Sequence, residues 1–382
     1  MSLDALERQR LTVPQKLLQI RWLFVFAIVL VAGVGAGMLV SAANGSFQPW
    51  AVRHIVRFGV CAVFMMAIAV TDVRIWLRYA YWIYAGVLAL LVAVEIAGSV
   101  GMGAQRWIDL GVINLQPSEL MKTAVVLALA RYFHGVDMED IGRPLLLVVP
   151  LALVAAPTVL VLKQPDLGTS LMLLAAGGAV FFAAGVRLWK FALVIAAAGG
   201  VMPVLWGMLH DYQRQRVLTF LDPESDPLGS GYHIIQSKIA LGSGGLLGKG
   251  YLQGTQSHLN FLPERQTDFI FTMLAEEFGL VGGVGLMVLY LVVMAYGFAI
   301  ALSSRNQFGR LLAVGLTTTF FLYVFINMAM VMGLIPVVGV PLPLISYGGT
   351  AMMALMIGFG LMLSVYVHRD VMIGRKHAGE EI

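Results

Sequence analysis

Ten apolar segments, most of them about 20 residues long, constrain the fold of this 382-residue chain more than any other feature. A helix of that length crosses a hydrocarbon core roughly 30 Å thick. Inside lipid, every backbone N–H and C=O must find a partner within the protein, so the segments must form helices. The segments are residues 22–42, 53–71, 79–98, 117–133, 144–162, 169–186, 188–208, 269–301, 311–332 and 345–367. The sequence therefore predicts an all-α polytopic membrane protein with ten transmembrane helices.

Composition indicates the same class. Hydrophobic residues make up 59% of the chain and charged residues 12%, whereas soluble proteins carry roughly 25% charged residues. We predict one membrane domain over residues 1–382, without a separate soluble domain. The only cysteine, Cys61, falls in the second apolar segment, so we expect no intrachain disulfide. The net charge of +4 reflects basic loops at one membrane face and predicts no nucleic-acid partner.

Lysine and arginine residues are distributed unevenly between the two ends of the predicted helices. With both termini inside, fifteen of them lie on the inner side and nine on the outer side. Cytoplasmic loops of membrane proteins carry such an excess of positive charge. The pattern predicts two cytoplasmic termini, an arm at residues 1–20 and a tail at residues 368–382.

A long loop, residues 209–267, connects predicted helices 7 and 8 on the outer, periplasmic side. Loops of this length are usually functional or disordered, and the aromatic residues of this one are typical of a folded segment. Within it, residues 212–221 (YQRQRVLTFL) are expected to form a short interfacial helix. We predict a folded cap over the bundle.

The eighth apolar segment, residues 269–301, is too long for one upright crossing. As a continuous helix it would measure about 50 Å at 1.5 Å per residue. Glycines cluster at positions 279, 282, 283 and 285, where a break in the helix costs least. We predict a kink there, with the half-helix at 268–278 lining a cavity at the outer interface.

The segment LPERQTDFIFTMLAEE, residues 262–277, places acidic residues where this apolar helix begins. Ionisable groups at bilayer depth are costly and usually mark a functional site. Asp268 is compatible with a helix-capping role and with a general-base role, because a carboxylate at the mouth of an apolar cavity can accept a proton. Glu264, Glu276 and Glu277 flank it, and a cap alone requires none of them. We therefore treat these three as candidate substrate-binding residues.

A second charged motif lies in GAQRWIDLGVINLQPSELMK, residues 103–122. Glu119 and Lys122 are three residues apart and share one face of predicted helix 4. They form either a structural ion pair or a charged wall that faces Asp268. Arg106 lies in the outer connection that precedes them and is a candidate for binding the same substrate.

Two external motifs have both a conformational and a binding interpretation. KQPDLGT, residues 163–169, needs only its Pro and Gly to turn, but it also carries Lys163 and Asp166. LGSGGLLGKGYLQG, residues 241–254, lacks the glycine and the Ser or Thr that a P-loop requires. It forms either a chain reversal, which we favour, or a nest in which glycine N–H groups and Lys249 bind a pyrophosphate.

Residues 333–350, GLIPVVGVPLPLISYGGT, contain three prolines and four glycines. They cannot form a regular helix, and irregular backbone at this depth must be buried in protein or line a cavity. We predict a re-entrant segment, with Ser346 as a candidate binding residue. No His or Cys cluster in the sequence has metal-ligand spacing.

With these motifs, the chain resembles the SEDS family (shape, elongation, division and sporulation) over nearly its whole length. Within the family, residues 242–256 and 333–349 look like the elongation branch, RodA, more than the division branch, FtsW. One departure is Gln266, where relatives often carry His, and it leaves Asp268 in place. The matching motifs are GAQRW (103–107), QPSELMK (116–122), KQPDLGTS (163–170), LPERQTDFIF (262–271), AEEFG (275–279) and PLPLISYGGT (341–350).

The resemblance implies a peptidoglycan glycosyltransferase of the bacterial inner membrane, with a periplasmic active site. It also implies lipid II as the substrate, and a class B penicillin-binding transpeptidase and the elongation machinery as partners. By the same resemblance, Asp268 is the catalytic base of an inverting reaction. Lys122, Arg106 or a divalent cation, Mg²⁺ or Mn²⁺, would offset charge on the pyrophosphate. The sequence identifies no ligands for such a cation.

Three alternatives remain open. A lipid II flippase would also use intramembrane charges, but it needs a polar path across the full membrane, and here the charges gather toward the outer half. The division branch of the same family would share the chemistry. A purely structural scaffold would leave the carboxylates without a role. We favour the polymerase of the elongation branch.

Overall fold

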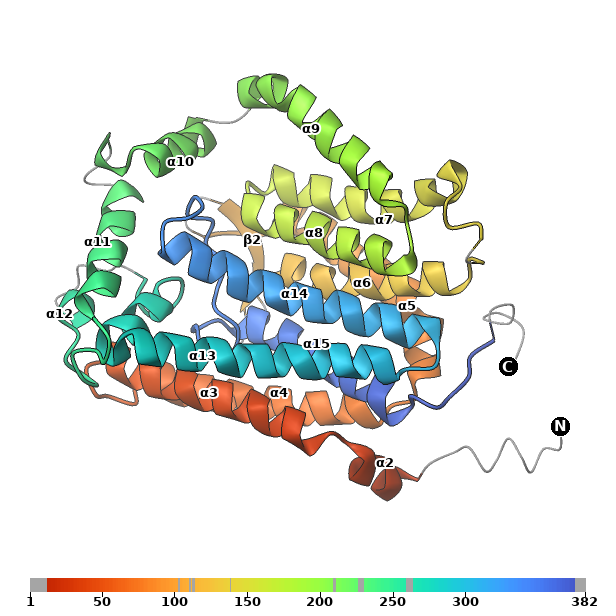
Figure 1. Ribbon diagram of the computed structural model, residues 1–382, viewed down its shortest axis with the longest axis horizontal. Coiled ribbons are helices and arrows are strands. Elements are labelled where there is room, and N and C mark those ends of the chain that lie inside the picture. The colour runs from red at the N-terminus through yellow and green to blue at the C-terminus, as the bar shows by residue number, and fades with distance from the viewer. Residues whose placement is uncertain are drawn as a thin grey trace.

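The computed structural model describes residues 12–101, 104–109, 111, 114–137, 139–208, 211–225, 230–258 and 264–374. A short helix, α2 (Val13–Gln19), comes first, and ten longer helices in the described chain then occupy the ten predicted apolar segments. Nine of them form one bundle and α9 runs outside it, with α2 at one end of the molecule and α11 at the other (Figure 1). The ten are α3 (Trp22–Ala42), α4 (Trp50–Val70), α5 (Val73–Ala97), α6 (Pro117–His134), α7 (Pro144–Lys163), α8 (Leu167–Ala184), α9 (Leu188–Met208), α13 (Ile270–Ser303), α14 (Gln307–Val331) and α15 (Gly349–Val367).

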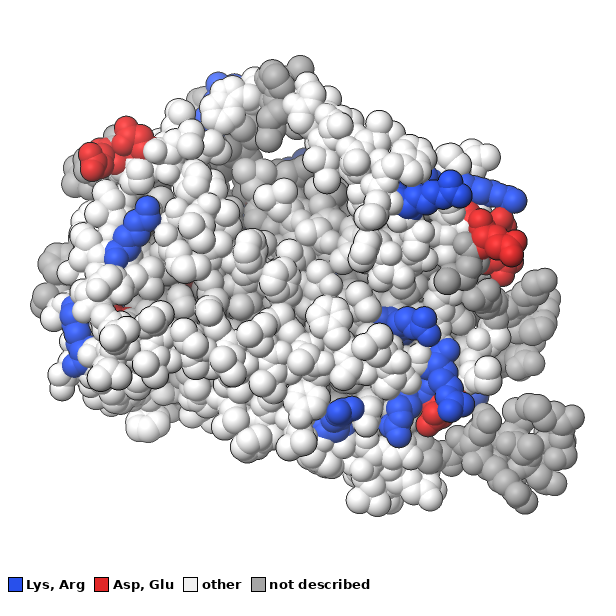
Figure 2. Space-filling model, in the orientation of Figure 1, with Lys and Arg blue, Asp and Glu red and all other residues white. Residues whose placement is uncertain are grey.

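Eight of these helices are long and apolar enough, by length and composition, to cross a membrane. Of the other two, α6 carries Glu119, Lys122 and Arg131, and α9 provides an apolar stretch over Leu188–Val201. The face drawn in Figure 2 has a broad uncharged band between two charged ends. The structure thus confirms the predicted class, an all-α polytopic membrane protein.

The centre of the bundle is formed by α14 and α15. Their apolar windows are 67% and 83% buried, whereas those of α4 and α5 are 22% buried. Small residues allow helix α15 to approach α4 closely, since a Cβ atom placed on Gly360 would lie 2.8 Å from the Met65 carbonyl oxygen. Helices in membranes commonly pack through such small residues.

A small antiparallel sheet joins α5 to α6, which the sequence had not predicted. Its order is β1 (Ser99–Gly101), β2 (Ala104–Asp109), β3 (Asn114–Leu115), with Ile108 opposite Leu115. Thr350 at the start of α15 donates a hydrogen bond to the Asn114 carbonyl at 2.9 Å. The sheet therefore packs against the end of the bundle where α15 begins.

The segment between α9 and α13 is folded in its described parts. It contains α10 (Asp211–Leu221), the 3₁₀ turn η1 (Pro223–Ser225), α11 (Ser230–Ser243) and α12 (Thr255–His258). Helix α10 confirms the predicted short helix. Ser237 fixes α11 to the bundle, because it donates to the Val331 carbonyl and lies 2.8 Å from the Thr272 hydroxyl.

Helix α13 is broken at Gly279, as the glycine cluster predicts. Gly279 has φ 64° and ψ −161°, a conformation that side chains oppose. The glycine-rich stretch that follows α11, residues 244–250, forms backbone hydrogen bonds to both sides of the break. Lys249 and Gly250 donate their N–H groups to the carbonyls of Glu276 and Glu277, each at 3.0 Å. The N–H groups of Leu280 and Val281 donate to the Gly245 and Leu246 carbonyls, so the freed backbone groups of the break are satisfied.

We expect Gly248→Ala to destabilise the protein by at least about 2 kcal/mol. Gly248 has φ +79°, and an added Cβ would lie 2.1 Å from the Glu277 carbonyl oxygen. Gly245→Ala is the matched control, because φ there is +55° and nothing lies within 4 Å of the added atom. Thermal unfolding in detergent should show a clearly larger loss for Gly248→Ala. Equal melting temperatures for the two variants would contradict the close packing of stretch and helix.

Candidate functional site

Asp268 lies in a tight turn directly before α13. The helix begins at Ile270, and its N-cap residue is Phe269, whose side chain makes no capping bond. Asp268 is half-buried and precedes this N-cap residue by one position. Glu264 closes the turn, because its carboxylate accepts hydrogen bonds from Gln266 and Thr267 at 3.3 and 3.1 Å.

The irregular segment between α14 and α15 packs against this turn. Ser346 donates to the Thr267 carbonyl at 2.5 Å, and the Tyr347 N–H donates to the Gln266 carbonyl at 2.8 Å. A Cβ atom placed on Gly339 would lie 3.3 Å from Asp268 Oδ2, so the carboxylate sits directly against this segment. Residues 340–346 of the segment are mostly buried, whereas residues 333–339 are partly or fully exposed, and Ser346 holds backbone in place.

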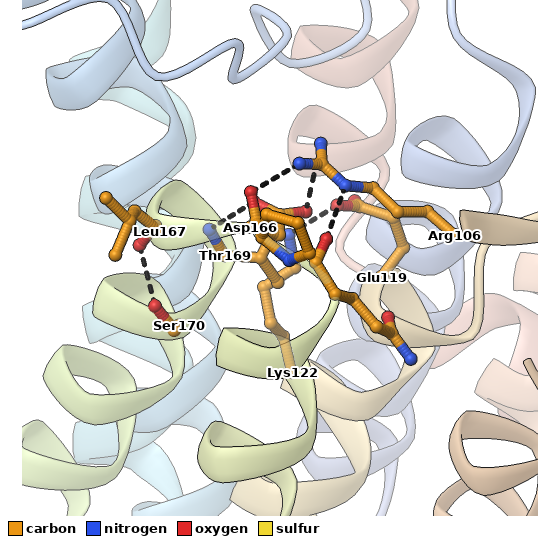
Figure 3. Close-up of polar contacts among 9 residues, drawn as sticks. Arg106, Glu119, Lys122, Asp166, Leu167, Thr169 and Ser170 are labelled. Carbon is orange, nitrogen blue, oxygen red and sulfur yellow. Dashed lines mark hydrogen bonds and ion pairs between the residues drawn. The ribbon is translucent and has the colours of Figure 1, made fainter. Parts of the chain in front are cut away.

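Arg106 joins the small sheet to the turn between α7 and α8. Its guanidinium donates to the carbonyls of Gln164 and Pro165 at 2.9 and 2.5 Å and lies 3.8 Å from Asp166 (Figure 3). Asp166 is the N-cap of α8 and accepts from the Thr169 N–H and hydroxyl. Arg106 from β2 and Asp166 in the turn therefore hold the turn in place, whereas the Lys163 side chain is exposed at the end of α7.

Glu119 and Lys122 form a buried ion pair near the start of α6, shown beside the Arg106 cluster in Figure 3. Lys122 Nζ lies 2.6 Å from Glu119 Oε1, and Lys122 is 1% exposed. Tyr323 donates its hydroxyl to the other Glu119 oxygen, and its ring lies 4.2 Å from the ammonium. A cavity of about 20 Å³, room for about one water molecule, adjoins the pair. Removing either charge would leave the other buried without its partner.

The α14–α15 segment connects these clusters. Val338 packs on Gly168, two residues after Asp166, since a Cβ atom there would lie 3.0 Å from the Val338 carbonyl oxygen. The next residue, Gly339, supports Asp268. The candidate residues from α6, α8 and the turn before α13 thus lie at one end of the bundle.

Glu276, Glu277 and Lys249 belong to the break in α13 and not to the turn of Asp268. Glu276 is fully buried and accepts from Lys249 Nζ at 2.8 Å and from the Gln256 N–H at 2.9 Å. Glu277, also fully buried, accepts from the Ser41 hydroxyl of α3. The stretch therefore reverses the chain beside α13, and both the ammonium and the N–H of Lys249 bond to Glu276.

Two groups near these clusters and outside the spans have shifted pKa values. Burial, followed by the Glu277 carboxylate, raises the pKa of Tyr251, so its phenol stays protonated and donates to the Gly37 carbonyl at 2.8 Å. Burial lowers the pKa of Arg265, but a guanidinium remains charged at neutral pH. The turn of Asp268 therefore carries a positive charge three residues before the carboxylate.

Sequence reasoning missed two polar residues of α14, Tyr323 and Asn327. Both are buried, and they lie four residues apart on one face of the helix. Tyr323 contacts Glu119, and Asn327 donates to the Asp268 carbonyl at 3.0 Å. Their spacing within an apolar span was the available signal.

The described residues contain no group of three His, Cys, Asp or Glu side chains that could hold a metal ion.

The fold and the site define a polytopic membrane protein that holds acidic and basic residues at one end of its bundle. The profile of the FtsW, RodA and SpoVE family, described as cell cycle proteins, matches residues 15–371. The chain belongs to this family.

Individual relatives agree with this assignment. The chain is 48% identical over 350 residues to the peptidoglycan glycosyltransferase MrdB of Escherichia coli K12, covering 90% of this chain and 93% of that protein. It is 35% identical to a probable peptidoglycan glycosyltransferase FtsW of Geobacter metallireducens, covering 96% of each chain. The identity is therefore higher to MrdB than to this FtsW.

Solved structures share the fold. A chain from work on the structural coordination of polymerization and crosslinking by a peptidoglycan synthase complex has a TM-score of 0.80 at 35% identity, covering 92% of this chain and 98% of that one. The rod shape determining protein RodA of Thermus thermophilus has a TM-score of 0.70 at 29% identity, covering 92% and 97%.

Proposed function

We propose that this protein is a peptidoglycan glycosyltransferase that polymerises lipid II during cell elongation, with Asp268 as its general base. The relatives named as glycosyltransferases support the activity, and the higher identity to MrdB supports the elongation branch. The observation that carries the proposal is the half-buried Asp268 carboxylate, which lies against Gly339 in the turn before α13.

The reaction joins two sugars with inversion. The C4 hydroxyl of an N-acetylglucosamine attacks C1 of an α-linked muramyl pyrophosphate, and Asp268 takes the hydroxyl proton. The new O4–C1 bond forms as the bond between C1 and the pyrophosphate oxygen breaks, and the leaving group departs with the electron pair. The product linkage is β. A base positioned within hydrogen-bond reach of the hydroxyl contributes typically 10²–10⁴-fold to the rate.

Positive charge must offset the charge that develops on the leaving pyrophosphate. Our candidates for this role are Arg265, in the same turn as Asp268, and Arg106, because both side chains are only partly buried. Lys122 is 1% exposed and bonded to Glu119. We therefore assign it to the buried framework of the site and not to direct contact with substrate. A divalent cation, if bound, would neutralise the pyrophosphate further.

We also propose the partner and the orientation. The partner is a class B penicillin-binding transpeptidase, which is supported by the likeness to a chain of a peptidoglycan synthase complex. Both termini lie in the cytoplasm, and the Asp268 end of the bundle faces the periplasm of an inner membrane. The excess of Lys and Arg on the inner side supports this orientation.

Purified protein mixed with lipid II, with and without a class B transpeptidase, tests the proposal. We expect glycan chains in the presence of the partner, separated by length on a gel. The new linkages should be β, because the reaction inverts the anomeric centre. Lipid II that stays monomeric with the partner bound would reject the enzyme assignment.

A further inference from the structure

Asn327 holds two chain segments at the candidate site. Its side chain is fully buried near the end of α14. The amide nitrogen Nδ2 donates one hydrogen bond to the Asp268 carbonyl at 3.0 Å and another to the Val340 carbonyl at 2.7 Å. Both N–H donors are used, and two carbonyl acceptors fix which end of the amide is the nitrogen.

The two acceptor carbonyls belong to the two segments that determine where the Asp268 carboxylate lies. One is the backbone of Asp268 itself. The other is the backbone of Val340, and the residue before it, Gly339, is the one that Asp268 Oδ2 contacts. The single amide group of Asn327 therefore fixes both the backbone of Asp268 and the segment at Gly339 that the Asp268 carboxylate contacts.

The amide oxygen of Asn327 indicates that stability alone does not explain this residue. Oδ1 is buried and accepts no hydrogen bond from the part of the chain that the structure describes. An unsatisfied buried polar atom is destabilising, and native proteins retain few of them. An apolar residue of similar size would avoid this cost but would provide no N–H donor.

The same face of α14 also contacts the buried ion pair. Tyr323, one turn before Asn327, donates its hydroxyl to Glu119 and covers the Lys122 ammonium with its ring. One rigid helix therefore sets the position of Asp268 relative to Glu119 and Lys122. We infer that Asn327 is a positioning residue for the reaction, which fixes the Asp268 carboxylate through its own main chain and through Val340. The inference rests on the proposed role of Asp268 as the base.

The test is the rate of lipid II polymerisation by the full-length protein with its transpeptidase partner. Asn327→Leu removes both donors at similar volume, and Asn327→Asp keeps the shape but replaces the donors with oxygen. We expect kcat to fall by about 100-fold, because small misplacements of a reacting group cost on this scale. KM should stay within about threefold of the wild-type value, since substrate contacts are unchanged.

Thr317→Val is the matched control. Thr317 is buried on the same helix and donates to the Ala313 carbonyl within it, away from Asp268. Its loss removes a buried polar group without touching the site, so kcat should match the wild type. All rates are normalised to folded protein, measured by size-exclusion chromatography, so that a loss of folding does not imitate a loss of kcat.

Asp268→Asn is measured in parallel. If Asp268→Asn is inactive while either folded Asn327 variant keeps wild-type kcat, the positioning role is rejected and the base assignment stands. If Asp268→Asn polymerises normally, the base assignment fails, and the positioning role fails with it. A kcat loss in Asn327→Asp that is matched by Thr317→Val would also reject the inference, because a general packing defect would then explain both.

Discussion

Asp268→Asn is expected to lower the rate of glycan polymerisation by at least about 100-fold, the typical lower limit for losing a general base. Asn keeps the size and the polar character of Asp but cannot take a proton from the attacking hydroxyl. The turn should survive, because the bonds that Glu264 and Ser346 make to it do not involve the Asp268 carboxylate. The measurement is the initial rate of chain formation from lipid II at equal amounts of folded protein.

Asp370→Asn is the matched control for this prediction. Asp370 is exposed and lies after α15, where it pairs with Arg305 at the other end of the bundle. Its rate should equal that of the wild type. Near-normal polymer from Asp268→Asn would remove the base assignment and leave the carboxylate with a structural role.

Lys122→Met is expected to destabilise the protein by about 3–5 kcal/mol, because it leaves Glu119 as a buried charge without its partner. The methionine side chain fills the same space but provides no ammonium. The alternative for the protein is to protonate Glu119, which also costs free energy at neutral pH. Thermal unfolding in detergent and the yield of folded protein measure the loss.

Glu119→Gln combined with Lys122→Met separates stability from activity. The neutral pair removes the buried charge, and a glutamine oxygen can still accept from Tyr323, so folding should recover. Polymerisation should not recover, because the buried Glu119–Lys122 ion pair beside the site is lost. Full activity in this double variant would show that the pair has only a structural role.

The sequence predicted the helices well because a long apolar run in lipid has one stable backbone solution. The ends were less accurate. Helices α4 and α5 begin at Trp50 and Val73, three and six residues before the predicted starts. Arg74 and Arg78 ended the apolar window of α5, but a long basic side chain can extend toward water while its backbone remains helical.

The break at Gly279 was predictable from the glycine cluster, but its partner was not. The bonds from Lys249 and Gly250 cross about 27 residues of sequence, and no local pattern encodes such pairing. The sheet over residues 99–115 was missed for a related reason, since its strands are two to six residues long.

The candidate site was predictable in its charged residues and not in its framework. Glu119 and Lys122 were expected to pair from their spacing, and the structure confirms the pair. Tyr323 and Asn327 carry no charge, and single polar residues in an apolar helix do not reveal which neighbours they bond. Their roles depend on the way α14 packs between α6 and the turn of Asp268.

The central claim is that this protein polymerises lipid II at the membrane face that carries Asp268. Vesicles with that face outward, supplied with lipid II only in the outer leaflet and with the partner transpeptidase present, test the claim most directly. We expect glycan chains in wild-type vesicles without any transfer of lipid II to the inner leaflet, and none in Asp268→Asn vesicles. Labelled lipid II that exchanges between leaflets and stays monomeric would contradict the claim and identify a transporter.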